Sequence, residues 1–287
     1  MSNIAGIHLQ GYTDAYEVAS VGFGCYVVLD IDGIQIVSDL RAYSSDAVIL
    51  VRVYERDIIQ RNPESWADYC ASVYYHFRPW TRHITPANET NIEGGSRDAN
   101  GYAYLNSWML RWYNRFRPQC PDAIVHFPAI SPSPTEHLYV YQYCSQAVEI
   151  CDVLDVHTYW TAYRPVQNAA SEYFLARNYF PHKWAMITEY NRIWNHASYA
   201  DGVAYGEEVI QFINLISRDT GLIGAASFLW STPDPAHYQM TWRAQPVADI
   251  VTRMHKPESN WKEPLSLYGL PGWVYLLAGG VLLSILI

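Results

Sequence analysis

Short apolar segments rich in β-branched residues alternate along this chain with longer segments of helical spacing, and this alternation restricts the fold more than any other feature. Strands that are covered by helices are apolar along their whole length. Eight such strands in about 250 residues predict an α/β fold of the (β/α)8 TIM-barrel type. The predicted strands are Ile4–Gln10, Cys25–Asp30, Ala47–Tyr54, His83–Glu89, Ala123–Ile130, Val153–Tyr159, Trp184–Glu189 and Ala225–Trp230.

The segments between these strands predict the helices. Asn62 followed by Pro63 is typical of a helix start. An open, doubly wound sheet is the competing α/β architecture. It is disfavoured because no glycine-rich phosphate loop follows an early strand. The clearest helical periodicities cover Tyr102–Phe116, His137–Ile150, Ser171–Tyr179 and Glu207–Ile216.

The predicted barrel occupies residues 1–255 and is followed by a polar linker at 256–264. Residues 265–287 carry no charge and exceed the roughly 20 residues that cross a bilayer. We therefore expect a hydrophobic tail that anchors the protein in a membrane; packing of the tail on the barrel or on a partner is the alternative. Lys256 and Lys262 precede the tail, so the positive-inside rule places the barrel in the cytoplasm. The N-terminus lacks the pattern of a signal peptide.

Charge and composition exclude several classes of function. The net charge is −9, and no cluster of Lys or Arg offers a face for nucleic acid, so we expect no nucleic-acid partner. Polyanionic substrates are disfavoured for the same reason. The five cysteines form no CxxC pair and the histidines no HExxH or HxH pattern, which predicts reduced, buried thiols, no metal site and no cofactor. Aromatic residues reach 15%, which fits either a heavy core or a sugar-binding surface.

The active site of a TIM barrel lies at the carboxyl ends of its strands. We therefore searched the predicted strand ends for ionisable and sugar-binding side chains. His8 and His126 are also expected inside the barrel, without an assigned role. The candidates at the strand ends are Arg52, Asn88, Glu89, His157, Tyr159, Glu189 and Trp230.

Glu89 and Glu189 are the candidate catalytic carboxylates. Glycosidic cleavage commonly uses two carboxyl groups, one that protonates the leaving oxygen and one that attacks the sugar or activates water. Strands three units apart face each other across a small barrel, so these two side chains are expected to meet at its mouth. Glu93 is a rival for the acid role. We rank it lower because it belongs to the Gly94-Gly95 loop, where we expect it to be held less rigidly.

The order of these residues resembles that of the clan A retaining glycoside hydrolases, most closely the cellulase and mannanase family, over about Ile4 to His255. That resemblance implies that Glu89 is the acid/base and that Asn88 binds the sugar 2-hydroxyl. It also implies that Glu189, in the sequence Ile187-Thr-Glu-Tyr190, is the nucleophile.

By the same resemblance, His157 and Tyr159 support the nucleophile, Trp230 floors the sugar site, and Arg52 is the arginine of the third strand. Thr90 stands where the family often has proline, which loosens the assignment to one particular family.

The sequence thus predicts a retaining glycoside hydrolase that cleaves a β-linked oligo- or polysaccharide. Two alternatives remain open. One is a barrel that binds a glycan or a protein without turnover. The other is a phage-type lysin that cuts cell-wall polysaccharide.

Overall fold

Eight parallel strands close into a barrel in sequence order, which confirms the predicted TIM barrel. The computed structural model describes residues 4–9, 15–95, 97–131, 134–161, 163–192, 202–230 and 242. Its strands are β1 (Ala5–Leu9), β2 (Cys25–Leu29), β3 (Val48–Arg52), β4 (His83–Thr85), β5 (Ile124–Phe127), β6 (Val153–Trp160), β7 (Trp184–Arg192) and β8 (Leu222–Ser227).

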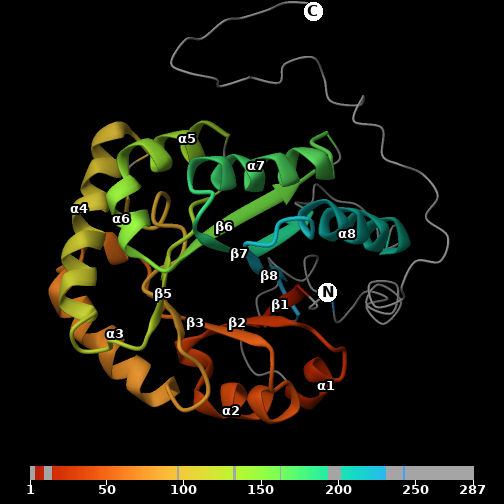
Figure 1. Ribbon diagram of the computed structural model, residues 1–287, viewed down its shortest axis with the longest axis horizontal. Coiled ribbons are helices and arrows are strands. Elements are labelled where there is room, and N and C mark those ends of the chain that lie inside the picture. Colours follow the sequence, from red (N-terminus) through yellow and green to blue (C-terminus); the bar gives the residue numbers. More distant parts are fainter. Residues whose placement is uncertain are drawn as a thin grey trace, which may run out of the picture. The chain divides into compact units, whose positions relative to one another are not determined.

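The helices lie outside the ring of strands (Figure 1). Asn62 caps the start of one of them as predicted, because its side chain accepts a hydrogen bond from the backbone of Ser65 at 2.9 Å. The helices are α1 (Ala15–Ala19), α2 (Ile34–Tyr43), α3 (Pro63–Phe77), α4 (Ala99–Phe116), α5 (Pro134–Tyr143), α6 (Ser145–Ile150), α7 (Val166–Tyr179) and α8 (Gly202–Ile216), with short 3-10 turns η1 (Asp30–Asp32) and η2 (Ile58–Gln60).

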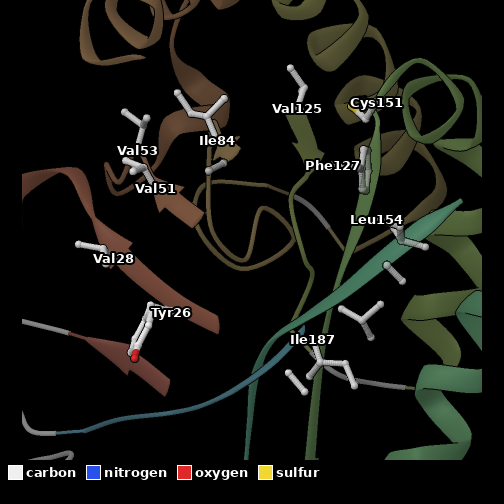
Figure 2. Close-up of a cluster of buried hydrophobic side chains, with 14 of the residues drawn as sticks. Tyr26, Val28, Val51, Val53, Ile84, Val125, Phe127, Cys151, Leu154 and Ile187 are labelled. Carbon is white, nitrogen blue, oxygen red and sulfur yellow. The ribbon is translucent and has the colours of Figure 1, made fainter. Parts of the chain in front are cut away.

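Alternate residues of each strand serve two different cores. The outward set packs beneath the helices and includes Tyr26, Val28, Val51, Phe127 and Ile187, as Figure 2 shows. The inward set fills the barrel with a smaller cluster: Cys25, Val27, Leu50, Val153, Met186 and Ala226. We call this inward cluster the apolar layer. Since side chains alternate along a strand, its two faces have different partners: the outward face packs on the helices, and the inward face fills the barrel.

The strand boundaries differ from the prediction by one to four residues at most ends, and the differences in β4, β7 and β8 bear on the candidate residues. β4 ends at Thr85 because Pro86 has no N–H to continue the ladder, so Glu89 lies in the loop beyond the strand. β7 continues three residues past Glu189. β8 begins and ends three residues early, so Trp230 follows the strand.

The single helix expected over His137–Ile150 is wrong. The chain leaves the helical conformation at Cys144, with φ −104° and ψ 12°, and divides the segment into α5 and α6. The Cys144 thiol is buried and donates to the carbonyl of Tyr102 at 3.1 Å. All five cysteines are free and buried, as predicted.

The described residues all belong to a unit that spans Met1–His255. Among these described residues, no helix has the length and apolar character to cross a bilayer. The linker at 256–264 and the hydrophobic tail at 265–287 lie outside the described residues, so the membrane anchor stays a prediction.

Candidate active site

Glu189 is the centre of a buried polar network at the carboxyl ends of the strands. Its side chain is only 6% exposed. Arg52, the last residue of β3, donates from Nη1 to Oε1 of Glu189. The Tyr159 hydroxyl of β6 donates to the other oxygen at 2.6 Å. Both oxygens of this carboxylate are therefore held by donors from other strands.

A β-bulge turns Glu189 toward the inside of the barrel. Val156 pairs with Ile187, but the next residue of β6, His157, pairs with Glu189, so Thr188 is an extra residue on β7. Simple alternation from Met186, which points inward, would have sent Glu189 outward. One extra residue reverses the faces beyond it. The bulge thus places Glu189 inside and Tyr190 in the outer core.

The surroundings of Glu189 favour its ionised form. Burial alone raises the pKa of this carboxyl, but His157, Arg52, His8 and the hydrogen bond from Tyr159 outweigh burial and lower its pKa below the ordinary value. Arg52 is permanently charged. Burial and Arg52 in turn lower the pKa of His8 to about 3, so His8 is neutral. Glu189 is therefore an anion whose two oxygens accept hydrogen bonds from the Arg52 guanidinium and the Tyr159 phenol.

Glu89 meets the same network through His157. The Nδ1 atom of His157 lies 2.8 Å from Oε1 of Glu89 and 3.5 Å from Oε2 of Glu189. Its other nitrogen, Nε2, lies 3.3 Å from Nη2 of Arg52. Since a guanidinium can only donate, we assign the proton of a neutral His157 to Nδ1, which donates to Glu89. His157 therefore links the two carboxylates.

The two carboxylates are close neighbours. Ligand atoms of Glu89, His157 and Glu189 all lie within 4.8 Å of one another, a spacing at which a metal ion could be held. The nitrogen that faces the carboxylates is Nδ1, however, and with its proton it offers no lone pair to a metal. Arg52 also places a positive charge beside the cluster. The arrangement is better suited to moving protons between acids than to binding a cation.

Two of the predicted binding residues lie apart from this network. The Asn88 amide donates to Oε1 of Glu93 at 2.8 Å, in the loop that carries Glu89. Trp230 is 4% exposed, and its ring lies edge-on to Phe23 with centroids 6.3 Å apart. Among the described contacts, Trp230 touches the site only through its backbone N–H, which donates to the carbonyl of His8. Its role as a sugar platform stays a prediction.

Three further residues lie near the site: His8 and Phe228, which had no sequence-based role, and Glu93, the rival for the acid role. His8 was expected inside the barrel, and its Nδ1 lies 3.7 Å from Glu189. Phe228 places its ring 5.3 Å from the ring of His8, so it is an aromatic neighbour of that histidine. Glu93 binds Asn88. The alternation of β1 pointed to His8, whereas no local pattern separates Phe228 from other residues near β8.

Several solved structures with a similar fold are described as glycoside hydrolases. An endo-beta-1,3-glucanase of family GH128 from Amycolatopsis mediterranei, in complex with laminarihexaose, matches with a TM-score of 0.61 and 13% identity, over 88% of this chain and 98% of that chain. The corresponding enzyme from Pseudomonas viridiflava matches at 0.57 and 15% identity, over 89% and 98%. A psychrophilic family 10 endo-beta-1,4-xylanase matches at 0.59 and 10% identity, over 79% and 86%.

These identities are too low to carry more than the fold. The coverage shows that the shared barrel extends over nearly the whole length of the glucanases. Neither a protein-family model nor a curated protein matches the chain.

Proposed function

We propose that this protein is a retaining glycoside hydrolase with Glu189 as nucleophile and Glu89 as acid/base. One observation carries the proposal: an oxygen of Glu89 and an oxygen of Glu189 lie within 4.8 Å of each other, and Glu189 is held as an anion by Arg52 and Tyr159. Retaining enzymes keep their carboxyl groups about 5–5.5 Å apart, whereas inverting enzymes leave about 6.5–9.5 Å for a water molecule. The short separation supports the retaining mechanism.

In the first step, Glu189 attacks the anomeric carbon of the sugar. The bond from that carbon to the leaving oxygen breaks, and Glu89 gives its proton to that oxygen. The product of this step is a sugar ester of Glu189 and a free alcohol end of the glycan. Arg52 and Tyr159 hold the carboxylate in place for attack, since each already binds one of its oxygens.

In the second step, Glu89 accepts a proton from water, and the water oxygen attacks the same carbon. The ester bond breaks, and Glu189 leaves as a carboxylate again. Nδ1 of His157 lies near an oxygen of each carboxylate. Its N–H can therefore donate to whichever carboxylate is charged at a given step. Two displacements at one carbon restore its original configuration.

A β-linked, neutral glycan is the substrate class that we propose. The related barrels include endo-beta-1,3-glucanases, one of them bound to laminarihexaose, and an endo-beta-1,4-xylanase. The net charge of −9 and the acidic site disfavour polyanionic chains. β-1,3-Glucan and xylan are therefore the first substrates to test, and peptidoglycan tests the phage-lysin alternative.

The decisive experiment is a hydrolysis screen on this glycan panel with the wild type, Glu89→Gln and Glu189→Gln. Each substitution keeps the side-chain shape and should lower kcat by about 10³-fold or more. Glu149→Gln, on the exposed end of α6, is the matched control and should leave kcat unchanged. NMR of the first-formed product should show the β-configuration.

Two results would contradict the proposal. Wild-type rates in either folded glutamine variant would remove that residue from the mechanism. A product with inverted configuration would exclude the double displacement. Tight glycan binding without any cleavage would support the non-catalytic barrel instead.

A further inference from the structure

Glu93 is a partly buried carboxylate that the two-carboxylate mechanism does not use. It lies in the same tight turn as Glu89. The backbone N–H groups of Ile92 and Glu93 both donate to the carbonyl of Glu89 at 2.9 Å, and that of Thr90 donates to Asn88 at 2.9 Å. The position of Glu93 is thus fixed to the backbone of the proposed acid/base.

The two glycines that follow pack closely against other backbone. Gly94 has φ +81°, and a Cβ atom there would lie 2.7 Å from the Cα of Asp57. A Cβ on Gly95 would collide with the carbonyl of Thr90. Both positions therefore require glycine because backbone packs against backbone. The turn that carries Glu93 is therefore closely packed.

The Glu93 side chain leaves two buried acceptor atoms beside Glu89. Oε1 of Glu93 accepts the amide N–H of Asn88 at 2.8 Å. Oε2 of Glu93 and Oδ1 of Asn88 are buried, and no described residue donates a hydrogen bond to either. A buried acceptor without a hydrogen-bond donor costs free energy. These two oxygens therefore favour binding of a ligand that carries hydrogen-bond donors. Hydroxyl groups are donors of this kind.

The charges around Glu93 oppose a second anion. Burial raises the pKa of Glu93, the hydrogen bond from Asn88 partly offsets this, and the charges of Glu89 and Glu189 raise the pKa further. Arg52, whose charge lowers the pKa of Glu93, is already engaged by Glu189 and His157. A carboxylated sugar would therefore add a negative charge beside three carboxyl groups, with the Arg52 guanidinium already paired.

We infer that Glu93 is a specificity-determining residue that accepts a hydrogen bond from a sugar hydroxyl next to the scissile bond and excludes carboxylated sugars. The inference rests on the proposed function and deepens it, since it assigns the site to neutral, polyhydroxylated sugars. Glu93 also positions Asn88: it occupies one N–H of the amide and leaves the Asn88 oxygen to accept a second hydroxyl.

The substitution Glu93→Gln separates the positioning of Asn88 from the acceptance of a sugar hydroxyl. The glutamine oxygen can still accept from Asn88, while an N–H replaces the free acceptor and the negative charge is lost. We would measure binding by calorimetry in a Glu89→Gln background, so that the ligand stays intact and Arg52 keeps its partner Glu189. The ligands are laminarihexaose and the same oligosaccharide with its C6 hydroxyls oxidised to carboxylates; if the screen finds a better substrate, that glycan and its oxidised form replace them.

We expect Glu93→Gln to weaken binding of the neutral chain about 10- to 100-fold, as for a lost hydrogen bond to a charged group. Binding of the oxidised chain should stay equal or improve, so the preference for the neutral chain narrows. Glu149→Gln removes the same charge from the surface, near the amino end of β6, and should leave the preference unchanged. A merely structural role for Glu93 would weaken both ligands alike.

The inference is overturned if Glu93→Gln keeps the neutral-to-carboxylated preference of its parent, or if the parent binds neither chain. Failure of the proposed function looks different: the wild type binds a neutral glycan with the Glu93-dependent preference but cleaves none. Cleavage by the wild type together with an unchanged preference in Glu93→Gln would reject the inference and keep the function.

Discussion

Two layers inside the same barrel show how differently one strand can use its successive inward positions. Leu50 and Met186 belong to the apolar layer, while Arg52 and Glu189 lie further along the same strands in the polar network. The apolar layer needs only volume and shape. The polar network needs every donor and acceptor matched, because buried charges without partners are costly. Stability should therefore depend on size in one layer and on charge balance in the other.

Replacing Arg52 with methionine should have the largest effect on stability. Arg52→Met leaves the Glu189 carboxylate buried without its cation, which costs about 3–5 kcal/mol of unfolding free energy. In the double variant Arg52→Met/Glu189→Gln the orphaned charge is gone, so part of this loss should be recovered. Urea unfolding at pH 7 measures both. Equal stability of the single and double variants would mean that charge balance does not govern this layer.

Met186→Ala should produce the next largest effect, in the apolar layer. Loss of the buried thioether leaves a cavity in the apolar layer. We expect it to cost about 2–3 kcal/mol of unfolding free energy, in the lower part of the usual range for such changes. Activity per folded molecule should be unchanged. Met186→Leu keeps the volume and should cost less than about 1.5 kcal/mol. A large loss of kcat in folded Met186→Ala would show that the two layers are not independent.

The smallest of the three effects on stability concerns three neighbouring polar side chains inside the barrel: His83, His126 and Asp155. His83 Nδ1 lies 2.9 Å from His126 Nε2, and His126 Nδ1 lies 2.6 Å from a carboxylate oxygen of Asp155. Burial, then the neighbouring His126 and Arg41, lower the pKa of His83 to about 3. The unfolded chain, with an ordinary histidine, binds more protons between pH 6.5 and 3. Stability is therefore lost as the pH falls below 6.5, by up to about 1.4 kcal/mol per pH unit for this residue.

His83→Gln should reduce this loss between pH 7 and pH 5, by about 2 kcal/mol at most. His8, with its pKa also lowered to about 3, contributes a similar slope in both proteins. The exposed His76 of α3 offers the control substitution His76→Gln, which should keep the wild-type slope. If the stability of His83→Gln and of the wild type depended on pH in the same way, His83 would not be a source of the loss of stability at low pH.

The amino-acid sequence determined the number, order and approximate position of the strands, because a strand buried on both faces must be apolar throughout. Pro63 and Asn62 fixed a helix start by local hydrogen bonding. The candidates at the strand ends were also accessible, since the barrel brings all carboxyl ends to one side. Five of them meet in a single network: Arg52, Glu89, His157, Tyr159 and Glu189.

Only the tertiary structure decided how these side chains face each other. Arg52 and Glu189 are far apart in sequence, and no local pattern reveals their contact. Strand periodicity alone would direct Glu189 away from the interior; the bulge at Thr188 depends on pairing with β6 and turns it inward. The close packing of the turn after Glu93 likewise depends on a distant segment, since Gly94 packs against the backbone of Asp57. Local sequence sets which residues can form a strand, whereas register, bulges and backbone contacts arise from the pairing of distant segments.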